Sequence, residues 1–262
     1  MRACNNAVLP GERLPFVIDG TRVGWVAAAA VEALSAFPAI RVSADTVELT
    51  DPAALDHIAS ALAERGVLRR RGELFDVCAR PDLPAISRVD RGAIPFFGIR
   101  AAGVHLNGLV QRPDGLHMWV ARRAMDKLLD PGKLDHIVAG GIPAGLSPLR
   151  TLIKEAGEEA AIPPELASQA VLAASFGYAA ERREGLRRDW LYAYDLLLPE
   201  DFIPNPADGE VEAFELWPLA RVFAAVRDTA DFKFNVNLVL IDLFIRLGLI
   251  AGPEAASLRA AL

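Results

Sequence analysis

The stretch that decides the fold runs from Gly140 to Ile162 and reads GGIPAGLSPLRTLIKEAGEEAAI. Its three carboxylates, Glu155, Glu158 and Glu159, are spaced by three and four residues, so on a helix they share one face. Like charges at these spacings repel one another, at a cost of about 0.2–0.5 kcal/mol per adjacent pair. We therefore expect a cation to neutralise this acidic face.

The residues before the carboxylates predict where the helix begins. Ser147 is a favourable N-cap residue, and Pro148 suits the first helical position. An apolar stripe opposite the acidic face is predicted from Leu149, Leu152, Ile153 and Ala156.

A glycine-rich segment, with Gly140, Gly141 and Gly145, leads into this helix. Glycine permits tight turns in which backbone carbonyls face an ion. A glycine loop followed by clustered carboxylates is typical of a divalent-metal site with oxygen ligands, and Mg²⁺ is the first expectation, with Mn²⁺ as the second.

The same stretch resembles the Nudix box, the motif of the Nudix hydrolases, written G-x5-E-x7-R-E-U-x-E-E-x-G-U with U an aliphatic residue. Counted from Gly140, the motif's glutamates fall on Glu155, Glu158 and Glu159, and its final aliphatic residue falls on Ile162. The resemblance implies an α/β/α sandwich with a mixed sheet, metal-dependent hydrolysis of a diphosphate linkage, and these three glutamates as catalytic and metal-binding residues.

Three positions depart from the motif. Leu146 replaces the early glutamate, Lys154 replaces the arginine, and Ala161 replaces the late glycine. Lysine keeps the positive charge of arginine but not its two-pronged donor geometry. These departures keep a second hypothesis open, in which the same fold serves as a catalytically weak binding or regulatory module. An isomerase acting on a diphosphate ester is a more distant alternative, since the Nudix fold also supports that chemistry.

Three further segments are similar to one Nudix branch, which carries an extra N-terminal domain and in fungi is fused to thiamine pyrophosphokinase. They are PFFGIRAAGVHLNG at 95–108, MWVARR at 118–123 and FKFNVNLVLIDLFIR at 232–246. This resemblance implies thiamine diphosphate or its oxidised analogues as candidate substrates.

Additional site residues are expected outside the motif. The backbone carbonyl of Gly140 is a candidate metal ligand, and Glu210 is favoured over Glu212 and Glu215 as a further carboxylate because it follows Gly209 at the mouth of a strand. Lys154, Arg187, Lys233 and Asn235 are candidate substrate-binding residues.

Each of these candidates has a simpler interpretation. The arginines around residue 187 are more often a solvated turn, and Asn235 is somewhat better explained as a helix cap. His105, His117 and His136 have no partner at ligand spacing, which favours structural roles.

Composition limits the partners. With 262 residues and a net charge of −6, the chain is long enough for two modest domains, and its acidity argues against nucleic acid as the main partner. The longest apolar runs, Trp25 to Val31 and Leu238 to Ile245, are too short or too interrupted to span a bilayer. Two cysteines without metal spacing, and a start that lacks an apolar signal core, favour the cytoplasm.

The positions of turn-forming residues along the chain predict two domains. Residues 1–92 are expected to form a small α+β domain, 93–250 the Nudix domain and 251–262 a C-terminal tail, with the boundary in the turn-rich stretch at 80–92. The small domain is expected to shape specificity or to build a homodimer, and a small-molecule diphosphate is the expected partner of the larger one.

Overall fold

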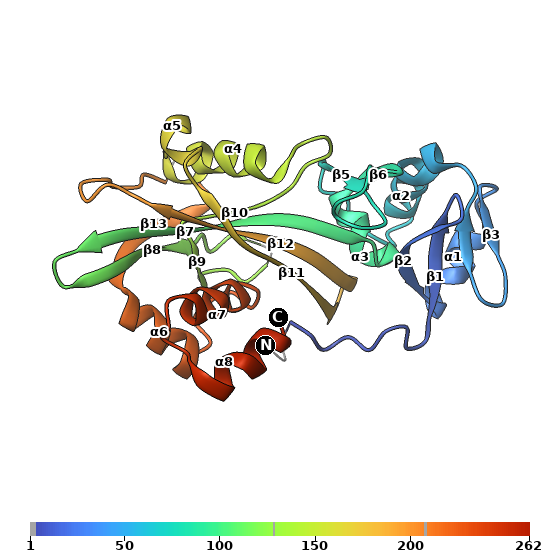
Figure 1. Ribbon diagram of the computed structural model, residues 1–262. Coiled ribbons are helices and arrows are strands. Elements are labelled where there is room, and N and C mark those ends of the chain that lie inside the picture. Colours follow the sequence, from blue (N-terminus) through green and yellow to red (C-terminus); the bar gives the residue numbers. More distant parts are fainter. Residues whose placement is uncertain (1–3, 128, 207–208) are drawn as a thin grey trace.

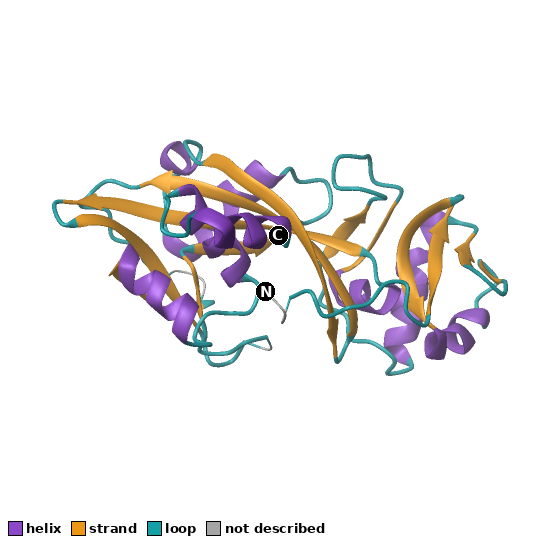
Figure 2. Ribbon diagram, turned by 60° about the horizontal axis from the view of Figure 1, so that its bottom comes forward, coloured by secondary structure: helices purple, strands orange, loops and turns teal. Residues whose placement is uncertain are grey.

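The computed structural model describes residues 4–127, 129–206 and 209–262. Figure 1 shows a small N-terminal unit beside a larger unit with long strands, and Figure 2 shows the same separation from another side. The small unit has a four-stranded sheet in the order β2-β1-β4-β3 and a two-stranded sheet β5-β6. Its elements are β1 (Arg13–Ile18), β2 (Thr21–Ala27), η1 (Ala28–Ala30), α1 (Val31–Ser35), β3 (Ile40–Val42), β4 (Val47–Leu49), η2 (Pro52–Ala54), α2 (Leu55–Glu64), β5 (Leu74–Val77), β6 (Ser87–Asp90), η3 (Arg91–Ala93) and α3 (Ile94–Phe97).

The larger unit is built on a seven-stranded mixed sheet. Its strands follow the order β11-β12-β7-β8-β13, with β10 paired to β7 and β9 to β8. Strands β12 and β7 run parallel, whereas β7 and β8 are antiparallel. The elements are β7 (Arg100–Arg112), β8 (Gly115–Arg123), β9 (Leu134–His136), β10 (Val138–Gly141), α4 (Pro148–Ala160), α5 (Pro164–Ala167), β11 (Val171–Arg182), β12 (Gly185–Leu197), β13 (Val211–Pro218), α6 (Leu219–Asp228), α7 (Val236–Arg246) and α8 (Gly252–Ala260).

Helices cover both faces of this sheet. Helices α4 and α5 lie on one side, and α6, α7 and α8 on the other (Figure 1). On the first side Leu152 and Ala156 of α4 pack against Val104 and Leu106 of β7. This α/β/α arrangement, preceded by a small β-rich unit, confirms the fold class that the sequence indicated.

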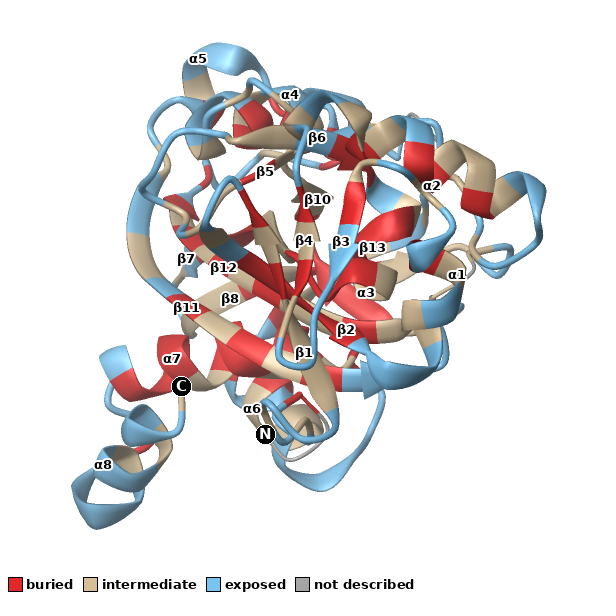
Figure 3. Cartoon of the chain, turned by 90° about the vertical axis from the view of Figure 1, so that its right-hand side faces the viewer, coloured by how far each residue is buried: buried red, intermediate tan, exposed pale blue. Residues whose placement is uncertain are grey.

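Buried residues lie along the strands of the four-stranded and the seven-stranded sheet, as Figure 3 shows in red. The core of the N-terminal unit extends through Ile94 and Phe97 to Ile99, so the residues that join the two units are packed. The boundary after residue 92 stays a prediction. The segment expected as a tail, residues 251–262, contains helix α8, which is largely exposed and packs on the α7 side through Ala255 and Leu258.

Candidate active site

Helix α4 begins as its sequence predicts. The backbone N–H of Arg150 donates to the Ser147 hydroxyl, and Pro148 occupies the first turn. The helix ends at Ala160 and is followed by the C-cap residue Ala161, whose φ of +54° lies in the left-handed region. Glycine adopts this conformation without strain, which gives a physical reason for the glycine that the motif places here.

The three carboxylates of α4 differ in burial. Glu159 is only 5% exposed, and its carboxylate accepts a hydrogen bond of 2.9 Å from the backbone N–H of Ala139 in β10. The side chain of Glu155 is 17% exposed and that of Glu158 is 51% exposed. Lys154 donates to Glu155 at 3.1 Å and to Glu158 at 2.5 Å. The cation that we expected beside the acidic face is therefore supplied in part by the helix itself.

One expectation about α4 is wrong. The acidic face was placed opposite the apolar stripe, yet Glu159 is buried on the same side as Ala156 and Ala160, while Leu149 is 38% exposed. The helix thus directs one carboxylate toward the sheet. A carboxylate in this position is costly unless a cation compensates it.

The electrostatics of this buried carboxyl favour a cation. Burial raises the pKa of Glu159 to about 8 against the opposing hydrogen bond from Ala139, and Asp135, Glu155 and Glu210 raise it further. Burial also raises the pKa of Glu155. Two neighbouring carboxyls that resist ionisation fit a site in which a bound metal ion holds them ionised.

Gly140 makes room for Glu155. A Cβ atom at position 140 would lie 2.7 Å from both Cγ and Cδ of Glu155. Gly140 also pairs with Val104 of β7, so strand β10 holds it against the sheet. The absence of a side chain at Gly140 therefore lets the Glu155 carboxylate lie next to the Gly140 backbone, whose carbonyl is a predicted metal ligand.

Glu210 lies just before β13 and pairs with Lys127 at 2.6 Å. The negative charge of Glu210 raises the pKa of Glu159, so the two carboxylates interact electrostatically. Glu215 instead accepts a hydrogen bond of 2.9 Å from the Trp217 indole. The role of Glu210 as a metal ligand stays a prediction.

A buried polar cluster next to this site was not foreseen from the sequence. Asp135 in β9 forms ion pairs with Arg123 at 2.9 Å and with Lys233 at 3.1 Å. The Nδ1 atoms of His105 and His136 are 3.0 Å apart. Ligand atoms of Asp135 and the two histidines lie within 4.8 Å of one another, so these three residues form a further group that could bind a metal ion.

This cluster corrects the statement that His105 and His136 have no partner. The two histidines are 31 residues apart in the sequence but meet between β7 and β9. Burial lowers the pKa of His136 to about 4, and it also lowers the pKa of His105. Burial alone would raise the pKa of Asp135, but Lys233 and the other cations hold it below its ordinary value. The cluster therefore contains neutral histidines around an ionised Asp135, which fixes Lys233.

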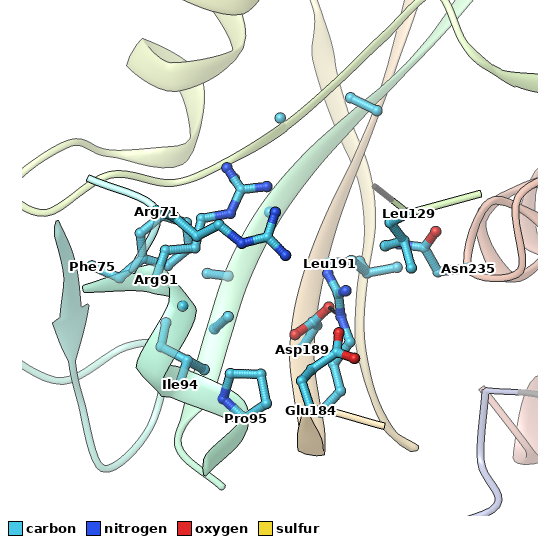
Figure 4. A pocket seen from close by; sticks show the side chains of 18 of the residues that line it. Arg71, Phe75, Arg91, Ile94, Pro95, Leu129, Glu184, Asp189, Leu191 and Asn235 are labelled. Atoms are coloured by element: carbon cyan, nitrogen blue, oxygen red, sulfur yellow. Dashed lines mark hydrogen bonds and ion pairs between the residues drawn. The ribbon is translucent and has the colours of Figure 1, made fainter. Parts of the chain in front are cut away.

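A cavity of about 390 Å³ lies between the two units and reaches the motif. Figure 4 shows its side chains converging from both units. Arg187, Lys233 and Asn235 line it, as do Ala139 and Gly140 of β10. The described residues that line this cavity do not include Lys154 or the four candidate carboxylates Glu155, Glu158, Glu159 and Glu210. The substrate-binding role of Lys154 stays a prediction.

The structure does not support the simpler interpretations of two cavity residues, Arg187 as part of a solvated turn and Asn235 as a helix cap. The Arg187 side chain is only 25% exposed and pairs with Asp189 at 2.7 Å, so it is not part of a solvated turn. Asn235 stands at the N-cap position of α7 but makes no side-chain capping hydrogen bond. Within the described residues its Oδ1 atom is buried without a hydrogen-bond partner, which leaves it available to a ligand.

A mixed sheet lies between helices, and a helix that carries three carboxylates packs on a glycine strand that lines a cavity. The chain belongs to the Nudix family, since the model described as the NUDIX domain matches residues 103–236. A second model, described as a domain of unknown function (DUF4743), matches residues 1–101. The chain is thus a Nudix-type hydrolase with an additional N-terminal domain.

Two relatives from Arabidopsis thaliana extend the likeness to both units. The chain is 37% identical to "Nudix hydrolase 24, chloroplastic" over 257 residues, which covers 94% of this chain and 70% of the relative. It is 36% identical to "Nudix hydrolase 20, chloroplastic" over 265 residues, which covers 94% of this chain and 71% of the relative. In the described part of the chain, no helix combines the length and apolar character needed to cross a bilayer.

Proposed function

We propose that this Nudix hydrolase cleaves the diphosphate linkage of a small organic diphosphate in a metal-dependent reaction. The observation that carries the proposal is the burial of Glu159 beside Glu155, next to a glycine strand that lines a cavity of about 390 Å³. Thiamine diphosphate and its oxidised analogues are the candidate substrates, supported by the similarity of the segments at 95–108 and 232–246 to the thiamine-linked branch.

The donor set fits a hard divalent cation. Glu155, Glu158 and Glu159, with the Gly140 carbonyl and Glu210, would hold Mg²⁺ or Mn²⁺ through oxygen atoms, which both ions prefer. Such an ion would neutralise charge on the diphosphate and would make the attacking water more acidic.

The protein's own groups would bind and orient the substrate. Arg187 and Lys233 present positive charge to the cavity, and the unpartnered Oδ1 of Asn235 accepts a hydrogen bond from the organic group. One of the three glutamates Glu155, Glu158 and Glu159 acts as the general base. Fixing Lys233 through Asp135 reduces the entropy lost on binding.

A test of this function is a substrate panel with Mg²⁺ and, separately, with EDTA. The panel contains thiamine diphosphate, its oxidised analogues, ADP-ribose, NADH and nucleoside triphosphates, and the readout is the monophosphate product. We expect metal-dependent cleavage that is selective for the thiamine compounds. Selective cleavage of another diphosphate would overturn the thiamine assignment and keep the reaction class.

A binding or regulatory module is the second candidate function. It is favoured by the ion pairs of Lys154 with Glu155 and Glu158, because this lysine competes with a metal for the same carboxylates. Magnesium binding without cleavage of any compound in the panel would select this alternative.

We also propose a reducing compartment such as the cytoplasm, on the ground that Cys4 and Cys78 are both free thiols. The names of the two plant relatives instead place those proteins in chloroplasts. A homodimer stays a prediction, and size-exclusion chromatography with light scattering would test it.

A further inference from the structure

Three arginines of the N-terminal unit line the same cavity as Gly140 and Gly141, the first two residues of the Nudix motif. They are Arg69 and Arg71, which precede β5, and Arg91, which follows β6. Figure 4 shows Arg71 and Arg91 reaching into the cavity from this unit, with Glu184 and Asp189 on the opposite wall. The cavity therefore has one wall from each unit.

A buried aspartate holds the two arginine segments together. Asp90 is fully buried and accepts hydrogen bonds of 2.8 Å from the backbone N–H groups of Arg71, Gly72 and Gly92. Arg70 pairs with Asp56 at 2.9 Å and with Asp90 at 3.5 Å. Arg70 therefore stabilises the N-terminal unit, whereas its two sequence neighbours line the cavity.

The N-terminal unit is also fastened to the motif itself. The backbone N–H of Ala144 donates to the Leu74 carbonyl at 2.8 Å, and that of Gly145 donates to the Asp76 carboxylate at 2.7 Å. Phe75 fills the space above Gly141, where a Cβ atom would lie 2.6 Å from its ring. These contacts fix the position of the arginines relative to the glycine loop before α4.

The cavity is strongly cationic although the whole chain is acidic. Its lining includes six cations, Arg69, Arg71, Arg91, Arg183, Arg187 and Lys233, and two carboxylates, Glu184 and Asp189. Burial lowers the pKa of Arg71, and Arg91, Arg69 and Arg187 lower it further, so positive groups from both units gather around it. No carboxylate in the described ranges forms an ion pair with Arg69 or Arg71, whereas Arg91 pairs with Glu73 at 2.9 Å. Such a cluster is complementary to a polyanion.

We propose that Arg69, Arg71 and Arg91 form a phosphate-binding wall that holds the terminal phosphate of the substrate while its other phosphate lies at the Nudix motif. The inference rests on the proposed diphosphate hydrolysis and assigns a role to the N-terminal unit. A diphosphate with a free terminal phosphate carries more negative charge than one that bridges two organic groups. The wall therefore selects terminal diphosphates over bridging ones.

The test compares Arg71→Ala and Arg69→Ala with Arg71→Lys, which keeps the charge, and with Arg41→Ala, which removes an exposed charge on β3 away from the cavity. Metal-free binding of inorganic pyrophosphate to the full-length chain is measured by calorimetry in EDTA. We expect about 10- to 100-fold weaker binding in both cavity alanine variants, as for loss of a charge-assisted hydrogen bond. Arg71→Lys should retain more affinity than Arg71→Ala, and Arg41→Ala should match the wild type.

A kinetic readout accompanies the binding assay. KM for thiamine diphosphate should rise in Arg71→Ala, and the preference for it over ADP-ribose should fall. Wild-type pyrophosphate affinity in both cavity alanine variants, or no metal-free binding by the wild type, would overturn the phosphate-binding wall whatever the hydrolysis assays give. If the wild type cleaves no diphosphate while Arg71→Ala still loses pyrophosphate binding, the wall stands and the proposed function fails.

Discussion

Replacing Glu159 by glutamine separates two effects of this carboxylate, the loss of stability caused by its burial and its proposed binding of a metal ion. Glutamine keeps an oxygen that can accept the hydrogen bond from Ala139 but has no charge. The wild-type carboxyl has a pKa of about 8 in the folded chain and an ordinary value of 4.5. Between these values the folded state holds a proton that the unfolded state has released. The contribution of the protonated Glu159 carboxyl to stability is therefore fully present below pH 4.5 and is lost as pH rises toward 8.

The size of the effect follows from the same difference. At pH 7 the gap above 4.5 corresponds to roughly 3 kcal/mol, at about 1.36 kcal/mol per pKa unit. In EDTA, Glu159→Gln should therefore unfold at higher urea concentration than the wild type, with a difference that grows from pH 5 to pH 8. Glu165→Gln, which alters an exposed carboxylate on α5, is the matched control and should follow the wild type.

Adding Mg²⁺ should reverse the order of the two proteins. The wild type gains stability through binding of the ion to the folded state, whereas Glu159→Gln lacks a ligand and gains little. Urea unfolding followed by tryptophan fluorescence, with and without Mg²⁺, measures both effects. Parallel stability curves for Glu159→Gln and the wild type from pH 5 to pH 8 in EDTA would refute the assignment of a protonated, buried Glu159.

Three further predictions concern the motif and its surroundings. Gly140→Ala should lower kcat about 10-fold or more, because its Cβ would lie 2.7 Å from the Glu155 side chain and would displace that carboxylate. The control Gly157→Ala, on the exposed side of α4, should keep activity and add about 0.5–1 kcal/mol of stability. Equal kcat values in the two variants would contradict this reasoning. Ala161→Gly should stabilise the chain by about 1 kcal/mol because it relieves the left-handed φ of +54°, and an unchanged or lower unfolding midpoint would count against strain at this position. His136 should stay neutral from pH 8 down to about pH 5, since burial lowers its pKa to about 4, and a ring resonance that titrates near pH 6.5 in NMR spectra would show that the histidine pair is hydrated.

The local features of the site were predictable from the sequence. Ser147 and Pro148 specify the start of α4 through backbone capping, and the spacing of the glutamates fixes their positions around one helix. Neither inference needs contacts from elsewhere in the chain. The burial of Glu159 was missed because it depends on how α4 docks on β10, which the spacing does not determine.

The remaining features depend on contacts between distant residues. Asp135 meets Lys233 across 98 positions, and the Asp76 contact with Gly145 spans 69 positions. Neither pair has a periodic pattern that would reveal it. The adjacent Asp135 and His136 in a buried strand were the available signal for the polar cluster, because charged or titratable groups in a buried strand require partners.

The most direct test of a metal site on helix α4 is magnesium-dependent monophosphate release by Glu158→Gln. It is measured beside Glu165→Gln and the wild type, with thiamine diphosphate and the other diphosphates as substrates. Glu158 is 51% exposed, so its replacement leaves the packing of α4 on the sheet intact. The proposed mechanism predicts that Glu158→Gln loses nearly all release while Glu165→Gln keeps it. Unchanged turnover in Glu158→Gln would contradict the assignment of the metal site to this helix.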